Sequence, residues 1–190
     1  MTSPHARSSA ISRLARLSTL ASAAVLAPAL AAGPALADLS SPEPPGRVCM
    51  FLAPENVFGL GHVGWAYRHA DGKLWDYGAT SYDERPWRAS NSLEQMLSDF
   101  RNREAAPSSF LYFRCRSTAE DDEAAAKAAA DTSDSEPYNL ITSNCLTRSL
   151  RIFHAYDGSA DLASLGSGLL TAPRWYFDHD LDGFEPQARL

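Results

Sequence analysis

The dipeptide Asp71-Gly72 limits the possible folds of this chain more than any other short segment. It lies between residues 62–69, in which large apolar side chains alternate with smaller or polar ones, and residues 73–78. An Asp-Gly pair between two such segments is a strong signal for a β-hairpin. Because a turn this short joins only strands that run in opposite directions, we expect an antiparallel sheet.

Further elements follow from the same kinds of pattern. Residues 47–53 and 110–115 are rich in β-branched and aromatic side chains and predict two more strands. Helices are predicted over 92–101, 117–131 and 145–156, and the second has Ser117 or Thr118 as its expected cap. The polar stretch 79–90 and the last thirty residues are expected to be mainly loops. The expected fold is a small α+β domain, an antiparallel sheet packed with about three helices.

Residues 1–37 are typical of a secretory signal peptide. Three arginines and no acidic residue precede or flank an apolar Leu/Ala stretch over 17–32, and Ala35-Leu36-Ala37 offers small residues for cleavage. Pro28 and Pro34 break the apolar stretch, so a membrane anchor is not expected. A Pro-rich spacer over 38–46 and a single domain over 47–190 follow, and we expect the mature protein to be secreted and extracellular.

The charge of the chain excludes one class of partner. The formal net charge is −6, and without the three arginines of the leader it becomes −9. An acidic domain with no Lys/Arg cluster does not suit nucleic acid, because no patch would release counterions. We expect no nucleic acid partner, no stable membrane insertion after cleavage, and a monomer.

Three cysteines leave one thiol to explain. Cys49 and Cys115 lie in predicted strands, and a disulfide between them is plausible in an oxidising compartment if the strands are neighbours. Cys145 would then remain free. The alternative is that all three are reduced and buried as small apolar side chains.

Cys145 stands at the start of a predicted helix, where N–H groups and positive potential lower the pKa of a thiol and could receive an oxyanion. A nucleophilic cysteine also needs a base, usually histidine. His62 opens a strand after a glycine loop and is the best candidate. His69 lies on the opposite face, His154 is too far along the helix, and His179 lies in the acidic tail.

Two motifs carry a family resemblance. Tyr138-Asn139-Leu140-Ile141-Thr142-Ser143-Asn144-Cys145, followed by a helix, resembles the nucleophile segment of the permuted NlpC superfamily of papain-like enzymes, which includes the lecithin:retinol acyltransferase-like proteins. Gly61-His62-Val63-Gly64-Trp65-Ala66-Tyr67, followed by Asp71-Gly72, resembles the histidine hairpin of that superfamily. In permuted members the histidine precedes the cysteine, as it does here, and the resemblance covers residues 62–158.

The resemblance implies a circularly permuted papain-like fold and a set of catalytic residues. Cys145 would be the nucleophile, His62 the general base, Asp76 the residue that orients His62, and Tyr138 part of the oxyanion site. The Leu146-Thr147-Arg148 sequence departs from the family pattern and leaves the substrate open.

The placement of Asp76 depends on the hairpin turn. With a strict two-residue turn, Tyr77 and Ala79 face the His62 side of the sheet. A bulge or a longer loop would place Asp76 there instead.

The resulting hypothesis is a secreted cysteine hydrolase that cleaves an amide, with cell-wall peptide (peptidoglycan) as its substrate. An acyl hydrolase or acyltransferase acting on lipid is a variant, and a secreted non-enzymatic binding or inhibitor module is the alternative from another class. Residues 178–183 imitate the opening of a calcium loop, but Arg189 stands where the bidentate Glu is needed. No zinc pattern occurs, so neither a metal nor another cofactor is expected.

Overall fold

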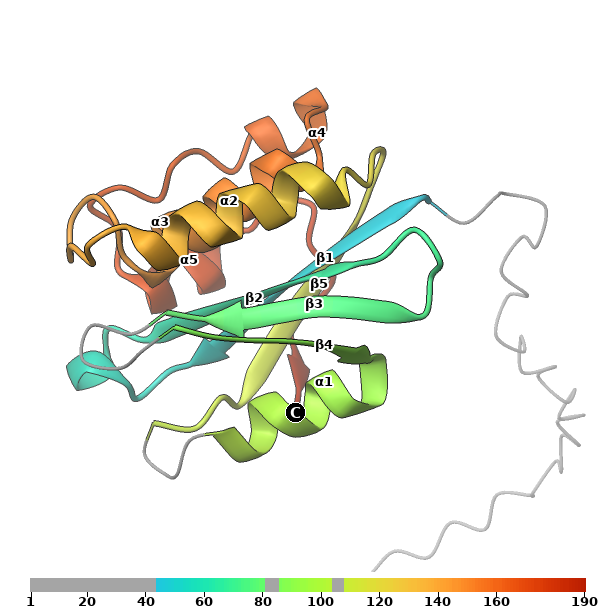
Figure 1. Cartoon of the computed structure of the whole chain (residues 1–190). Coiled ribbons are helices and arrows are strands. Elements are labelled where there is room, and N and C mark those ends of the chain that lie inside the picture. Colours follow the sequence, from blue (N-terminus) through green and yellow to red (C-terminus); the bar gives the residue numbers. More distant parts are fainter. Residues whose placement is uncertain (1–43, 81–85, 104–107) are drawn as a thin grey trace, which may run out of the picture. The chain divides into compact units, whose positions relative to one another are not determined.

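The computed structural model of the chain describes residues 44–80, 86–103 and 108–190 (Figure 1). The expected signal peptide and residues 38–43 of the expected spacer lie outside these ranges. The last residue of that spacer, Gly46, is already the first residue of a strand.

The described chain forms one antiparallel sheet in the order β4-β3-β2-β1-β5-β6. The central strand, β1, is buried along almost its whole length, which explains its nearly continuous apolar sequence. The strands are β1 (Gly46–Ala53), β2 (His62–Arg68), β3 (Leu74–Ala79), β4 (Trp87–Ser92), β5 (Tyr112–Thr118) and β6 (Ala188–Arg189).

The predicted hairpin is confirmed. β2 pairs with β3 in a register that places Gly64 opposite Ala79 and Tyr67 opposite Asp76. The Asp71 carboxylate accepts hydrogen bonds from the N–H groups of Lys73 and Leu74 at 2.8 and 3.1 Å. This Asx-type turn and the positive φ of Gly72 (71°) explain why Asp-Gly occupies the connection.

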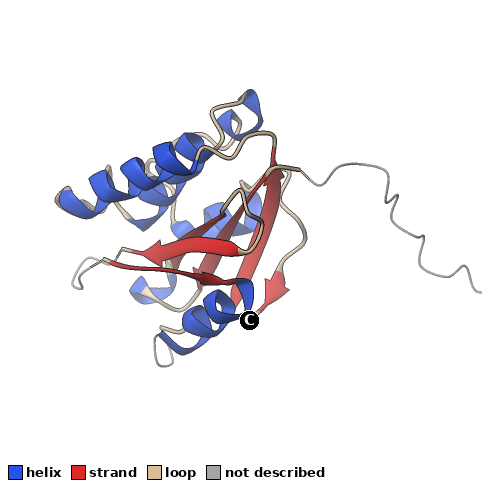
Figure 2. Ribbon diagram, turned by 45° about the vertical axis from the view of Figure 1, so that its right-hand side comes forward, coloured by secondary structure: helices blue, strands red, loops and turns tan. Residues whose placement is uncertain are grey.

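Helices cover both faces of the sheet (Figures 1 and 2). α2 (Glu123–Ser135), α3 (Cys145–Tyr156) and α5 (Pro173–His179) lie on one face, and α1 (Leu93–Arg103) lies on the other. Two short elements, η1 (Val57–Gly59) and α4 (Ala160–Ala163), complete the described chain. Gly64 allows α1 to approach closely, because a Cβ there would lie 2.5 Å from the Phe100 ring. The α+β class is therefore as expected.

Several boundaries differ from the sequence-based prediction, and the last thirty residues, expected to be mainly loops, include α5 and β6. The polar stretch 79–90 contains the start of β4, which pairs with β3 as an edge strand. Ser117 and Thr118 end β5 and pair with β1, so α2 begins later and is capped by Asp122, whose carboxylate accepts the Ala125 N–H at 2.9 Å. Strand pairing thus outweighs the local capping preference of Ser and Thr.

Cys49 and Cys115 are opposite each other on β1 and β5 and form the expected disulfide. Disulfides form and persist mainly in oxidising compartments. Within the described ranges, each helix is too short or too polar to span a lipid bilayer.

Candidate functional site

Cys145 is the first residue of α3, and Asn144 determines where that helix begins. The Asn144 side chain accepts hydrogen bonds from the N–H groups of Leu146 and Thr147, both at 3.0 Å, and its own N–H donates to Thr147 Oγ1 at 2.9 Å. This reciprocal capping box satisfies groups that a helix start otherwise leaves unpaired. It holds Cys145, which is only 3 % exposed, in a defined position.

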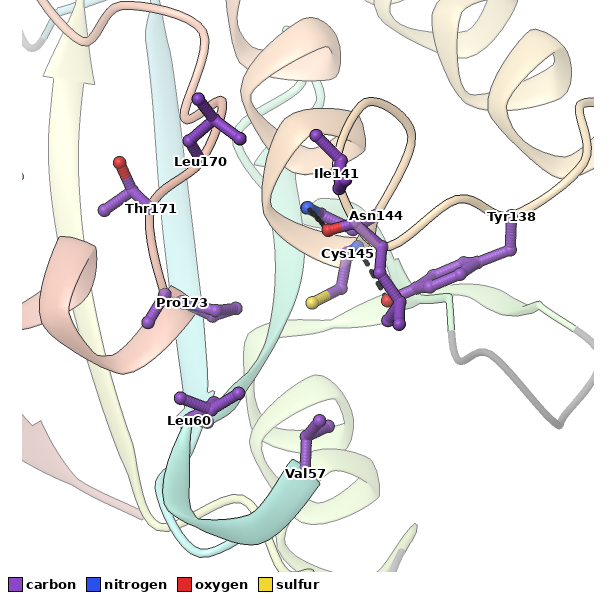
Figure 3. A pocket seen from close by; sticks show the side chains of 12 residues that line it. Val57, Leu60, Tyr138, Ile141, Asn144, Cys145, Leu170, Thr171 and Pro173 are labelled. Carbon is purple, nitrogen blue, oxygen red and sulfur yellow. Dashed lines mark hydrogen bonds between the residues drawn. The ribbon is translucent and has the colours of Figure 1, made fainter.

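The loop before α3 places the Tyr138 hydroxyl beside Cys145. Asn139 and Ser143 exchange two backbone hydrogen bonds of 3.0 Å, which fold the intervening residues into a tight turn. Tyr138 Oη accepts the Cys145 N–H at 3.2 Å (Figure 3). The structure therefore brings Tyr138 and Cys145 together.

Burial raises the pKa of the Cys145 thiol above its ordinary value. The N–H groups of Val63 and Leu146 and the Tyr138 hydroxyl act in the opposite direction, because each favours the thiolate. The net direction is upward, so the expectation of a lowered pKa at a helix start is wrong for this conformation: loss of hydration outweighs the helix terminus. The resting thiol is protonated at neutral pH, among donors that would stabilise a negative charge.

An open pocket of about 290 Å³ leads to the thiol. Figure 3 shows the Cys145 sulfur turned into this space, with Leu60, Leu170 and Pro173 around it. None of the described residues that line the pocket carries a charge. They are Val57, Leu60, Gly61, Tyr138, Leu140, Ile141, Asn144, Cys145, Leu170, Thr171, Ala172 and Pro173.

Five of these lining residues are apolar and exposed, and we call them the apolar rim: Val57, Leu60, Leu140, Ile141 and Leu170. Val57 and Leu170 have positive φ angles of 50° and 60°. Phe58, which follows Val57 and is fully exposed, also has a positive φ, of 56°. Left-handed backbone is unfavourable for such side chains and recurs at ligand sites. The pocket mouth is therefore both apolar and strained.

His62 directly precedes Val63, whose N–H contacts the thiol, but the His62 side chain points to the other face of the sheet. The Val63 N–H contacts the Cys145 sulfur, and Val63 belongs to the core below α3. The His62 ring instead lies 5.5 Å, centroid to centroid, from Phe110 in the core beside α1. Strand alternation separates the two neighbours. The imidazole does not line the pocket in this conformation.

Asp76 does not lie beside His62, and its expected role as the residue that orients His62 is corrected. The tight turn places Asp76 opposite Tyr67, whose hydroxyl donates to it at 2.8 Å. His69 bridges two carboxylates at 3.1 Å each, with Nε2 near Asp76 and Nδ1 near Glu123. We call Tyr67, His69, Asp76 and Glu123 the His69 cluster. Burial alone raises the pKa of Asp76, but hydrogen bonds with Ser90, Tyr67 and His69 bring it below its usual value.

The acidic segment 178–183 is held by arginines through its backbone. Arg114 donates to the Phe177 carbonyl at 2.9 Å and to that of Leu181 at 3.2 Å, and Arg116 donates to the Asp182 carbonyl at 3.0 Å. No three His, Cys, Asp or Glu side chains in the described chain are grouped to hold a metal ion.

The sequence-based prediction missed two features of the site, the burial of Arg148 against Tyr138 and the apolar rim. Arg148 is 2 % exposed, and its guanidinium lies over the Tyr138 ring, 5.3 Å from the centroid. Its position three residues after Cys145 on the apolar face of α3 was an available signal. The apolar rim comes from three separate loops, so no local pattern indicates it, although Leu140-Ile141 inside a polar turn is unusual.

Comparisons of the chain with protein-family models, with curated proteins and with solved structures found no match. The geometry around Cys145 and the motifs in residues 61–72 and 138–145 are therefore the observations that bear on function.

Proposed function

We propose that this chain is a cysteine hydrolase of circularly permuted papain-like arrangement, in which Cys145 attacks an acyl carbon. The observation that carries the proposal is a free thiol at an open pocket, surrounded by hydrogen-bond donors from Val63, Tyr138 and the start of α3. Such donors stabilise a thiolate and the oxyanion of a tetrahedral intermediate. A buried cysteine with a packing role alone does not require such donors.

In the proposed reaction, His62 takes the thiol proton as the bond between sulfur and carbon forms. The Cys145 N–H, released from Tyr138 Oη, and the Tyr138 hydroxyl hold the oxyanion. Collapse of the tetrahedral intermediate leaves a thioester on Cys145 and expels the leaving group. The leaving group receives the proton from His62. Water activated by His62 then attacks the thioester and releases the acid and the free thiol.

This mechanism requires the His62 imidazole to turn away from Phe110 and around the start of β2. Gly61, with φ of 85°, immediately precedes His62. The raised pKa of the resting thiol supports an inactive resting state. Formation of a thiolate–imidazolium pair on substrate binding would then activate the nucleophile.

The pocket favours an uncharged, apolar acyl group. Cell-wall peptide was the first substrate expected from the sequence, but such peptides carry charged groups, and the described lining offers them no ion pair. Apolar contact area stabilises an aliphatic acyl chain without such partners. This observation favours the acyl hydrolase variant over the peptidase.

The proposed location is extracellular. The Cys49–Cys115 disulfide supports an oxidising compartment, in agreement with the signal peptide expected over residues 1–37.

The proposal is tested by trapping the acyl-enzyme. The purified protein is incubated with p-nitrophenyl octanoate or with soluble cell-wall muropeptides, quenched in acid, and its intact mass is measured. We expect one octanoyl group on the peptide that contains Cys145, together with p-nitrophenol release that Cys145→Ala abolishes. An adduct from muropeptide alone would restore the peptidase hypothesis. If neither substrate gives an adduct or turnover above that of Cys145→Ala, the protein is a non-enzymatic binding module.

A further inference from the structure

Arg148 is a buried cation that forms no salt bridge with a carboxylate in the described chain. Its Nε–H donates to Ser143 Oγ at 3.1 Å, and a terminal N–H donates to the Glu136 carbonyl at 2.8 Å. The Glu136 carboxylate pairs instead with Arg151 at 2.7 Å. The hydrogen bonds of Arg148 therefore go to neutral oxygens and its guanidinium faces the Tyr138 ring, while the carboxylates of Glu136 and Asp134 act on its charge from a greater distance.

This arrangement is costly for a purely structural anchor. Removal of a guanidinium from water is unfavourable, and neutral acceptors compensate for it only in part. Burial accordingly lowers the pKa of Arg148. Because an uncharged donor would hold the 136–143 loop at a smaller cost, the retained charge points to a negative charge that arises nearby.

Tyr138 connects this charge with the thiol. The guanidinium lies against the ring face, and the hydroxyl at the end of the same ring contacts Cys145. A cation on the face of a phenol polarises the ring and strengthens the hydroxyl as a donor. Burial raises the pKa of Tyr138, and the charge of Arg148 opposes that rise.

We propose that Arg148 is a positioning residue for the Cys145 site and acts through Tyr138. It holds the phenol ring against the start of α3 and directs a polarised hydroxyl toward negative charge on the Cys145 sulfur or on a substrate oxygen. This inference rests on the proposed thiol chemistry. Its test, however, uses thiol reactivity alone and needs no turnover.

The test is the pH profile of alkylation by iodoacetamide, an uncharged reagent. Cys145 is the free cysteine of the chain, so a single rate is measured. In Arg148→Met we expect the midpoint of the profile to move to higher pH. Below the midpoint, the rate should fall by roughly threefold to thirtyfold, the range of a partly desolvated cation–π contact. Circular dichroism and thermal unfolding establish that the variant is folded.

Three further variants distinguish an effect through Tyr138 from a general loss of positive charge. Tyr138→Phe should slow alkylation at least as much, and Arg148→Met combined with Tyr138→Phe should be no slower than Tyr138→Phe alone. Arg151→Met is the matched control, since it removes a cation three residues further along α3 that makes no contact with the Tyr138 ring. Its profile should equal that of the unmodified protein.

An unchanged midpoint in folded Arg148→Met, or additive effects of the two substitutions, overturns the inference. If Arg148→Met does not fold, Arg148→Lys is used in its place. Lysine keeps the charge but loses the planar stack on the Tyr138 ring, so the midpoint of its alkylation profile must lie above that of the unmodified protein. A midpoint equal to that of the unmodified protein overturns the inference. A protein that shows the predicted pH profiles but forms no acyl-enzyme keeps this inference and loses the hydrolase proposal.

Discussion

The two ends of the β2–β3 hairpin differ in how their polar groups are satisfied. At the turn, His69 has a carboxylate 3.1 Å from each ring nitrogen, one from Asp76 and one from Glu123. At the start of β2, the Cys145 thiol lies among N–H and O–H donors, beside apolar side chains that remain exposed. The His69 cluster places a carboxylate beside each ring nitrogen in the resting protein, whereas the Cys145 end places donors around a thiol that carries no charge.

Backbone strain follows the same division. The described non-glycine residues with positive φ are Val57, Phe58 and Leu170; Val57 and Leu170 line the pocket, and Phe58 is adjacent to Val57. The turn at the other end uses Gly72 where positive φ is needed. Strained backbone is retained at functional sites and removed where only stability matters. The comparison therefore predicts that substitutions at the two ends have different consequences.

The largest expected difference is between the two histidines of β2 and its turn. His62→Ala should lower kcat/KM for ester hydrolysis by about a hundredfold to ten-thousandfold, the usual effect of losing a general base. His69→Ala should leave kcat/KM unchanged and lower the midpoint of thermal unfolding, because Asp76 and Glu123 lose their shared partner. Steady-state kinetics and thermal unfolding of both variants provide the comparison.

A His62→Ala variant with normal kcat/KM would show that the imidazole stays beside Phe110 and that another group accepts the thiol proton. Equal losses of activity in both variants would mean that the two ends are coupled through β2, against the division described above.

Asp76→Asn should affect stability at the turn end and leave the Cys145 end unchanged. The folded-state pKa of Asp76 is depressed, so its contribution is present above the unfolded-state pKa and is lost as pH falls through the folded-state value. We expect the free energy of unfolding at neutral pH to fall by roughly 1.5–3 kcal/mol, the range for a hydrogen bond to a charged group. The decline in stability toward acid should become shallower, as measured by urea unfolding over a pH series.

Asp71→Asn is the matched control in the same hairpin. Its amide oxygen can still accept the hydrogen bonds from the N–H groups of Lys73 and Leu74, so the turn is retained. A loss of stability as large as that of Asp76→Asn would show that a general charge effect, and not the His69 cluster, is responsible.

Much of the fold could be predicted because its signals are local. The Asp71-Gly72 turn determines the β2–β3 register, and that register turns Asp76 toward Tyr67 and away from the His62 face. The register expected from a strict two-residue turn is therefore confirmed, and the role that the family resemblance implies for Asp76 is wrong. The start of α2 was missed because Thr118 is committed to β5 by its pairing with Gly46, a contact between residues far apart in the sequence.

The site was less predictable because most of its features depend on contacts between residues far apart in the sequence. The position of Cys145 at a helix start is a local feature and was predicted. The inclusion of Tyr138 in the site was implied by the family resemblance. The protonation of the thiol depends on burial by elements distant in sequence, and the apolar rim is assembled from three loops. Strand alternation places His62 on one face of the sheet, but the sequence does not show that this face packs against Phe110 and not against the thiol.

A smaller effect is expected at the apolar rim. Ile141→Ser should raise KM for an octanoyl ester by about fivefold, since part of one aliphatic side chain is lost from the contact, and should leave KM for an acetyl ester unchanged. Leu74→Ser is the matched control, because Leu74 is also exposed but lies at the turn end of the hairpin. An equal rise in KM for both esters would place the acyl chain outside the pocket.

The smallest expected effect is a gain in stability at Phe58. Its side chain is fully exposed and its φ is 56°, so Phe58→Asn loses little burial and introduces a residue that tolerates left-handed backbone. The free energy of unfolding should rise by roughly 0.5–1 kcal/mol. Leu60→Asn, at an ordinary φ of −71°, also removes an exposed apolar side chain and should give no gain. If Phe58→Asn is stabilised while hydrolysis of the octanoyl ester slows, the strained loop is retained for function, and the division between the two ends of the hairpin extends to the backbone. Stabilisation without any change in hydrolysis would confine the functional role to the side chains that line the pocket.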